Sequence, residues 1–152
     1  MAAEKSGRLD KVLELVNYIH TENPDGNALA QYVTLRTFSE FGAINLFLSE
    51  LKSGGLIFPT YQFGFSQEEI DSWQISNIEE NIPIADALKS NSFIWLADNE
   101  DWERDYPDLV KYKIPNAQTF ICWPIHIRGA YMTVIGTAFK NQVIQSQDIK
   151  NY

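Results

Sequence analysis

The stretch ICWPIHIRGAYMTVIG, residues 121–136, contains the only cysteine of the chain and one of its two histidines. Cys122 and His126 are candidates for a nucleophile and its base, or for part of a metal site. The alternation of apolar residues predicts strands here, and positions four apart in a strand share a face but lie about 13 Å apart. A thiol and an imidazole that react together need hydrogen-bond contact. The spacing therefore predicts that Cys122 is a packing residue, unless a bulge at Pro124 folds the strand.

Other chemical motifs are absent from the sequence. His20 falls in a predicted helix without a ligand partner at helical spacing, and one cysteine with two histidines is too few for a metal site. No glycine-rich phosphate loop, HExxH, GxSxG or calcium-loop spacing occurs. No spacing of carboxylates singles out an acid/base pair. We therefore expect no catalytic group, no metal and no cofactor, with a small enzyme that uses Cys122 as the alternative.

The strands NAQTFICWPIHI and AYMTVIGTAFK are expected to form a hairpin around a two-residue turn at Arg128 and Gly129. This register places Cys122 opposite Ile135 and His126 opposite Tyr131. One face of the hairpin then packs on helices and carries Ile121, Trp123, Ile125, Ile127, Met132 and Val134. The other face is mixed, and suits a pocket wall or a sheet surface open to water equally well; it carries Cys122, Pro124, His126, Tyr131 and Thr133.

Aromatic residues gather in two further segments, 61–73 and 95–112. Aromatic walls with a few polar groups are typical of small-molecule pockets, although core filling explains such residues as well. The acidic stretch that begins at Asp98 could hold a cationic ligand, but a solvated loop is the favoured interpretation. The candidate ligand-binding residues are therefore Tyr61, Trp73, Trp95, Asp98, Trp102 and Tyr106, together with Cys122, Pro124 and His126.

Length and composition predict one globular domain. The chain has 152 residues, of which 45% are hydrophobic and 21% charged, and a formal net charge of −8. The acidic balance disfavours direct contact with nucleic acid, because phosphate contacts need clustered lysine and arginine. A lone cysteine excludes an internal disulfide, and neither a secretory leader nor a run of about 18 apolar residues is visible. We therefore expect a cytoplasmic location and no contact with a membrane.

Periodicity predicts an α+β domain whose helices lie on the faces of an antiparallel sheet. An N-terminal helix is expected within residues 8–24, with an apolar stripe of Leu9, Val12, Leu13, Val16 and Ile19. A second helix is expected over 28–41, ending at Gly42. Strands are expected at 43–51, 56–63 and 92–98 and in the hairpin above, with helical segments at 66–91 and 100–113. A last helix begins at Ser146 and is cut at Tyr152, so the chain is expected to continue.

The segments IPIADALKSNSFIWLAD, DYPDL and FICWPIHIRGAYMTVIGTAF, in this order, resemble a GAF domain over residues 25–152. The resemblance implies a sheet of five or six antiparallel strands, related to that of PAS domains, with helices on both sides. It implies a pocket on the face covered by the insertion, and first and last helices that often pair between subunits. Such domains are usually sensory modules attached to helix-turn-helix regulators, histidine kinases or cyclic-dinucleotide enzymes.

The better-known chemistries of that family do not match this sequence. Cys122 is followed by Trp123 rather than by the histidine common in bilin-binding members, and the cyclic-nucleotide NKFDE motif is missing. A lone cysteine supports neither an iron–sulfur cluster nor the thiol exchange of free methionine sulfoxide reductases. Haem ligation by His126 stays open. We expect a non-enzymatic, homodimeric GAF sensor that binds an unknown small molecule and controls an output domain, most simply a helix-turn-helix regulator. An acyl-homoserine-lactone-binding domain is a further alternative.

Overall fold

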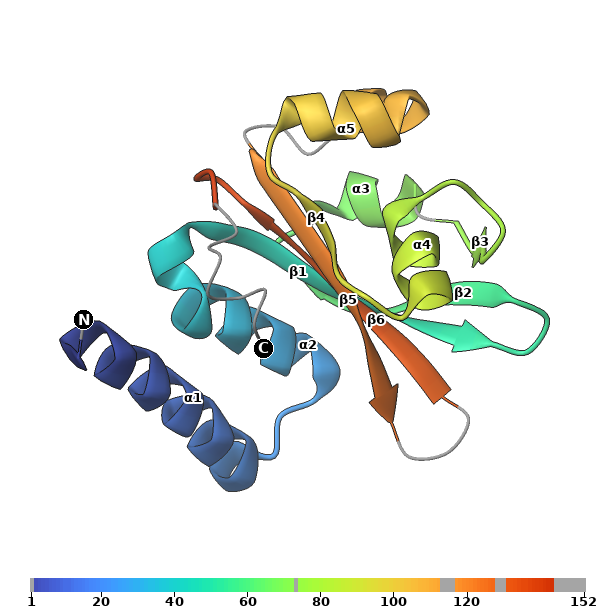
Figure 1. Ribbon diagram of the computed structural model, residues 1–152. Helices are drawn as coiled ribbons and strands as arrows, with labels where there is room; N and C mark the ends of the chain where they lie inside the picture. The colour runs from blue at the N-terminus through green and yellow to red at the C-terminus, as the bar shows by residue number, and fades with distance from the viewer. Residues whose placement is uncertain (1, 73, 113–116, 128–130, 144–152) are drawn as a thin grey trace.

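The fold is built on one antiparallel sheet with the strand order β3-β2-β1-β6-β5-β4 (Figure 1). The computed structural model describes residues 2–72, 74–112, 117–127 and 131–143. Its six strands are β1 (Ala43–Lys52), β2 (Leu56–Phe63), β3 (Ser76–Asn77), β4 (Ile94–Leu96), β5 (Thr119–Ile127) and β6 (Tyr131–Phe139). The predicted α+β class with a sheet of five or six strands is confirmed.

Helices cover both faces of this sheet (Figure 1). On one face lie α1 (Ala2–Glu22), α2 (Gly26–Tyr32), the π-helix η1 (Val33–Thr37) and the 3-10 helix η2 (Ser39–Phe41). The insertion between β2 and β5 supplies α3 (Gln67–Ser72), α4 (Pro83–Ser90), α5 (Asn99–Asp105) and the 3-10 helix η3 (Pro107–Tyr112). We call the two sides of the sheet the α1–α2 face and the insertion face.

Several helix and strand limits differ from those predicted. The helix expected over 28–41 is divided into α2, η1 and η2, although it ends as predicted at Gly42, which has φ +73°. The N-terminal helix begins six residues earlier than predicted, at Ala2. The strand expected over 92–98 is limited to Ile94–Leu96, because Asp98 already caps α5. The helix predicted from Ser146 lies outside the described residues.

The register of the last hairpin was predicted wrongly by one residue. Ile127 pairs with Tyr131, so that residues 128–130 separate the two strands instead of a two-residue turn. Cys122 therefore lies opposite Gly136 and His126 opposite Met132. Because side chains alternate along a strand, a shift of one residue exchanges the faces of the whole strand. Met132 and Val134 consequently share the insertion face with Cys122, whereas Thr133 and Ile135 share the α1–α2 face with Trp123.

The main core lies on the insertion face, between the sheet and the helices α4 and α5. Amphipathic α4 starts with Pro83 in its first turn and is capped at its C-terminal end by Asn91, which adopts a left-handed conformation with φ 50°. The helix buries Ala85, Ala87 and Leu88 against the sheet. These residues pack with the strand residues Ile57, Leu96, Phe120, Cys122, Val134 and Ala138. This core fixes the positions of three of the predicted site residues, Trp102, Tyr106 and Cys122.

Candidate functional site

The structure divides the predicted site residues between the two sheet faces. Tyr61 and Trp95 belong to the α1–α2 face: Tyr61 packs against Gly26 of α2, and Trp95 lies opposite Ile121 in the ladder. The insertion face holds Trp102, Tyr106, Cys122, Pro124 and His126. Trp73 lies outside the described residues. The nine candidates therefore do not line one common pocket, and ligand contact by each of them stays a prediction.

Cys122 is completely buried, with 0% of its surface exposed. Burial, together with the nearby carboxylate of Asp86, which repels a thiolate, raises the pKa of its thiol from 9.0 to about 12. His126 is exposed at the end of α4, where its Nε2 lies 2.6 Å from the Oδ1 of Asn91. As predicted, Cys122 is a buried packing residue, and the described geometry offers it no imidazole base.

We expect Cys122 to resist thiol reagents in the folded protein. A chromogenic aryl disulfide should label it only as fast as the chain unfolds, because reactive cysteines are exposed and have lowered pKa values. Since this is the only cysteine, the signal reports one site, and labelling in denaturant gives the full yield. Rapid stoichiometric labelling of the native protein would show that the thiol is accessible.

The raised thiol pKa also predicts a loss of stability in alkali. The unfolded thiol loses its proton near pH 9, whereas the folded thiol keeps it until about pH 12. The free energy of unfolding should therefore fall as the pH rises through this interval, by at most about 1.4 kcal/mol per pH unit for one group. Urea unfolding of the wild type and Cys122→Ala should show a stability difference that shrinks above pH 9. Tyr106 should also lower the free energy of unfolding in alkali, because burial and the carboxylate of Asp86 raise the pKa of its phenol.

The polar residues of the insertion have structural partners. The hydroxyl of Tyr106, the residue that caps α5, donates to Oδ2 of Asp86 at 2.6 Å, which links the end of α5 to α4. Asp98 caps α5 by accepting from the backbone N–H of Asp101 at 3.1 Å, and the carboxylate of Asp101 accepts from Ala97 N–H at 2.8 Å. The guanidinium of Arg104 forms two ion pairs, with Oδ1 of Asp101 at 3.0 Å and with Oδ1 of Asp105 at 3.0 Å. These contacts favour the solvated-loop interpretation of the acidic stretch over a cation site.

Aromatic side chains fill the space between the insertion and the sheet. The ring of Phe120 stacks on Phe47 at 6.1 Å between centroids and lies 5.4 Å from the ring of Trp102. Phe47 also meets Phe65 edge to face at 6.2 Å. Gly136 allows this arrangement, because a Cβ atom at that position would overlap the ring of Phe47. We name Phe47, Phe65, Phe120, Trp102 and Tyr106 the aromatic cluster.

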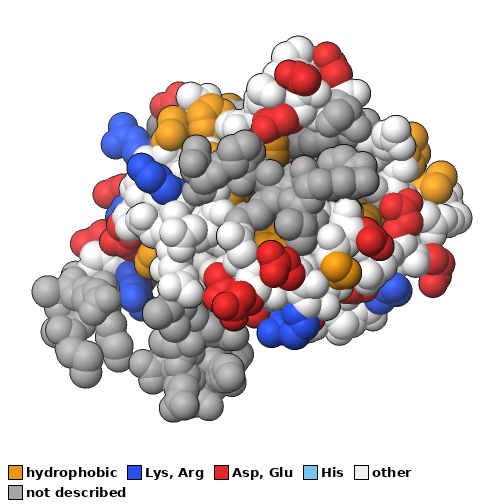
Figure 2. All heavy atoms as spheres, turned by 90° about the horizontal axis from the view of Figure 1, so that it is seen from above, with side chains coloured by type: hydrophobic (Ala, Val, Ile, Leu, Met, Phe, Trp, Pro, Cys, Tyr) orange, Lys and Arg blue, Asp and Glu red, His pale blue; other side chains and the backbone are white. Residues whose placement is uncertain are grey.

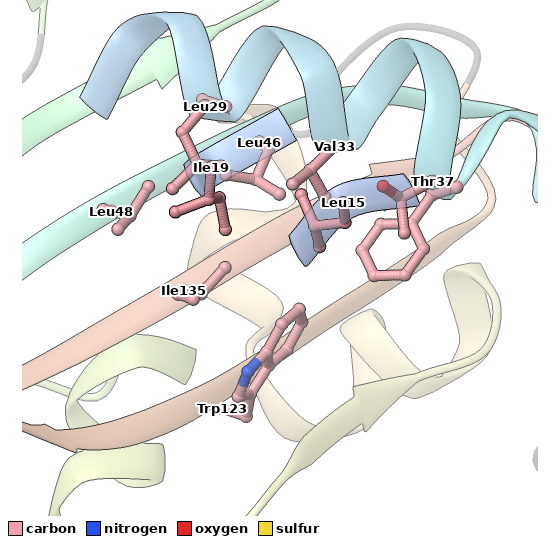
Figure 3. A pocket seen from close by; sticks show the side chains of 11 residues that line it. Leu15, Ile19, Leu29, Val33, Thr37, Leu46, Leu48, Trp123 and Ile135 are labelled. Atoms are coloured by element: carbon pink, nitrogen blue, oxygen red, sulfur yellow. The ribbon is translucent and has the colours of Figure 1, made fainter. Parts of the chain in front are cut away.

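A cavity of about 250 Å³ lies on the opposite, α1–α2 face (Figure 3). Its helical wall is apolar apart from one hydroxyl and includes Leu15, Ile19, Leu29, Val33 and Thr37. Its sheet wall includes Leu46, Leu48, Trp123 and Ile135. The resemblance to GAF domains implied a pocket on the insertion face, so this cavity was not expected. Five separate segments of the chain line it, and no local spacing in the sequence could have revealed it.

The apolar stripe of α1 faces solvent. Leu9, Val12, Leu13, Val16 and Ile19 are between 40% and 58% exposed. The described contacts of α1 with the rest of the domain are few: the ring of Tyr18 stacks on Tyr32 at 4.0 Å, and Lys11 Nζ donates to the carbonyl of Arg36 at 3.0 Å. Exposed apolar patches of this kind mark interaction sites. We call these five residues the α1 stripe.

The described part of the chain contains no group of three or more His, Cys, Asp or Glu side chains that could hold a metal ion. Within the same residues, none of the helices combines the length and the apolar character needed to cross a membrane.

The charged side chains of the domain are mainly acidic. In the view from above, acidic side chains are more frequent than basic ones over the visible surface, in accord with the net charge of −8 (Figure 2).

No protein-family model matches the chain, and no curated protein matches its sequence. Its structure is similar to the GAF domain of a phosphoenolpyruvate-protein phosphotransferase from Coxiella burnetii, with TM-score 0.68 and 14% identity over 95% of this chain and 84% of that chain. The corresponding Acinetobacter domain gives TM-score 0.67 and 12% identity over the same shares. A type II free methionine-R-sulfoxide reductase from Thermoplasma acidophilum gives TM-score 0.56 and 16% identity over 90% of this chain and 84% of that chain.

These similarities extend over nearly the whole chain and agree with the strand order and the two helical layers described above. At such low identity they define the architecture rather than the activity, because one fold carries many functions. The set includes both GAF domains of larger proteins and an enzyme. This chain has the fold of a GAF domain.

Proposed function

We propose that this chain is a cytoplasmic, non-enzymatic sensory GAF domain that forms a homodimer and regulates an attached output domain, most simply a helix-turn-helix transcription regulator. The exposed α1 stripe is the observation that carries the proposal. A helix that turns five large apolar side chains toward solvent needs a partner, since burying such a side chain contributes about 1.5–3 kcal/mol.

A second copy of α1 is the partner that we propose. Leu9, Val12, Val16 and Ile19 are separated by three, four and three residues, which is the a/d repeat of a helix pair. An isologous contact uses the same patch on both subunits, so one self-complementary stripe on α1 is sufficient to form the dimer interface. We also propose that the C-terminal helix expected from Ser146 joins this contact and transmits the signal to the output domain.

Val16→Glu should weaken the dimer by about 30- to 1000-fold, because two like charges would meet in a desolvated seam at a cost of several kcal/mol. Glutamate is a good helix former, so α1 itself should persist. Analytical ultracentrifugation over a range of concentrations measures the effect. Asn17→Glu, one position away and outside the stripe, is the matched control and should leave the dimer unchanged.

The dimer proposal fails if the wild-type protein is monomeric at high micromolar concentration. It also fails if Val16→Glu and Asn17→Glu have equal effects on the association. Circular dichroism of both variants shows whether the helices are retained, so that a loss of association is not mistaken for a loss of folding.

The buried state of Cys122 favours a sensor over an enzyme. One similar structure is a free methionine-R-sulfoxide reductase, so the fold itself permits catalysis. In this chain the only thiol is enclosed in the core with a raised pKa, and such cysteines are inert. The labelling experiment above separates the two proposals, because a thiol that reacts rapidly in the native protein would favour a Cys122 enzyme.

We further propose that the domain responds to a small molecule and makes no direct contact with nucleic acid or membranes. The net charge of −8 supports the first exclusion, because phosphate contacts require basic clusters. Binding to DNA would then be the task of the output domain. An acyl-homoserine lactone is the alternative ligand, and a screen by thermal unfolding distinguishes it from other small molecules.

A further inference from the structure

We propose that the cavity on the α1–α2 face binds a small, neutral and largely apolar molecule that carries one hydrogen-bonding group on a ring-containing skeleton. The site differs from the nine residues predicted from the sequence, of which none lines it. The proposal names a ligand class for the sensory role inferred above and depends on that role only for its regulatory meaning.

The size of the cavity limits the ligand. An apolar cavity of about 150 Å³ is known to stay dry and to bind benzene, so about 250 Å³ accommodates a ring with a short side chain, roughly ten non-hydrogen atoms. The cavity lies between α1 and the sheet (Figure 3), and it is partly open to solvent, which provides a route of entry. A nucleotide or a tetrapyrrole is too large for this volume.

The walls of the cavity select against charge. No lysine, arginine, aspartate or glutamate lines it, and its surface consists of aliphatic side chains with the rings of Phe38 and Trp123. Transfer of an ion into such surroundings is costly unless a partner of opposite charge or several hydrogen bonds receive it. Anions such as carboxylates and nitrate should therefore be excluded, whereas neutral aromatic or alicyclic molecules should be accepted.

One polar atom in the wall lacks a partner. The hydroxyl oxygen of Thr37 is buried without a hydrogen bond in the described structure, and Thr37 lines the cavity. Thr34, one turn earlier, shows the usual arrangement, because its hydroxyl donates to the carbonyl of Ala30 at 2.8 Å. Buried hydroxyl groups are nearly always paired. Rotation of the Thr37 side chain toward the cavity would let an alcohol, phenol or carbonyl group of a ligand complete the hydrogen bonding of its hydroxyl.

The backbone at this wall is also unusual. Val33–Thr37 forms a π-helix between α2 and η2, and both of its end residues line the cavity. Single-turn π-helices are rare and occur frequently at functional sites. The π-helix thus gives a second, independent reason to assign function to this side of the domain.

The part of the cavity wall that α1 supplies connects a bound ligand to the α1 stripe. Leu15 and Ile19 of α1 form part of the lining, and Ile19 also belongs to the stripe proposed to pair with a second copy. Few described contacts hold α1 in place, so a ligand packed beneath Leu15 and Ile19 would restrict its position. Occupation of the cavity would in this way bias the geometry of the dimer.

Three probes with one skeleton test the ligand class: phenylpropanol, propylbenzene and phenylpropanoate. Isothermal titration calorimetry should show binding of the alcohol, binding of the hydrocarbon that is about 3- to 10-fold weaker, and no binding of the carboxylate. The alcohol should also raise the midpoint of thermal unfolding. The proposal is overturned if the alcohol does not bind up to its solubility limit, or if the carboxylate binds equally well.

Two variants locate the site. Ile135→Trp fills the cavity and should reduce affinity for the alcohol at least about 10-fold. Thr37→Val keeps the shape of the wall but removes the hydroxyl, so the alcohol should lose its advantage over the hydrocarbon. Thr60→Val, on the exposed part of β2, is the matched control and should bind as the wild type does.

The variants also separate this proposal from the dimer proposal. Unchanged binding in folded Ile135→Trp, or an unchanged preference for the alcohol in Thr37→Val, contradicts the assigned site; should Ile135→Trp fail to fold, Thr37→Val alone decides. Ultracentrifugation of the same samples reports the dimer independently. Dimers without binding would refute the ligand site alone, and binding by a monomer would refute the dimer alone.

Discussion

Replacement of Gly64 by alanine is expected to lower the free energy of unfolding by about 3–5 kcal/mol. Gly64 follows β2 with φ +90°, a conformation that residues with a Cβ atom rarely adopt. An added Cβ would overlap the carbonyl oxygen of Ile44 and would lie 2.9 Å from the Cα of Asn45. Both contacts involve the backbone of β1, which cannot move without disturbing the sheet. Strain and steric overlap therefore act together at this position.

Gly54 is the matched control for this prediction. It has a similar φ of +82° in the turn between β1 and β2, but no atom lies within 4 Å of the position of its Cβ. Gly54→Ala should therefore cost only about 1 kcal/mol, which is the backbone contribution alone. Urea unfolding of both variants measures the difference. Equal losses at the two positions would mean that the close approach of Gly64 to β1 does not limit stability.

The second large loss of stability is expected from substitutions in the aromatic cluster. Phe47→Ala should cost about 2–4 kcal/mol, because it removes a ring that contacts Phe65 and Phe120 and leaves a cavity on the insertion face. Gly136→Ala should cost about 1–3 kcal/mol by overpacking, because its Cβ would occupy the space of the Phe47 ring. In the double variant the new Cβ enters the space that the ring has vacated.

The double variant should therefore be no less stable than Phe47→Ala alone, with a coupling of about 1–3 kcal/mol between the two positions. Chemical unfolding of the four proteins gives this coupling energy. Phe93→Ala is the control, since Phe93 is 61% exposed and its removal should cost less than about 1 kcal/mol. Additive losses would indicate that Phe47 does not depend on the absence of a side chain at Gly136.

Local signals in the sequence predicted most of the secondary structure. The period of two between 43 and 63, interrupted by glycines in a turn, predicted β1 and β2 almost to the residue. Proline in the first turn and the apolar face of PIADALKS predicted α4, and Gly42 ended the helical segment before β1 as expected. The two-residue strand β3 is too short to have a period and was missed.

The register of the β5–β6 hairpin could not be obtained in the same way. Arg128 and Gly129 are compatible with turns of different lengths, and the choice between two and three residues depends on how both strands pack in the sheet. One residue of difference moved Val134 from the predicted face beside Trp123 to the core beside Cys122, and moved Ile135 from the predicted position opposite Cys122 to the wall of the cavity. The site residues predicted on this hairpin were consequently assigned to faces with the wrong neighbours.

The sequence by itself determined the strands, the amphipathic helices, the GAF-like order of segments and the packing role of Cys122, because each depends on residues close together in the chain. Tertiary structure alone decided which side of α1 meets the domain, since periodicity locates an apolar stripe but not its partner. It also decided where the cavity lies. The walls of that cavity come from residues as far apart as Leu15 and Ile135, and only folding brings such distant positions together.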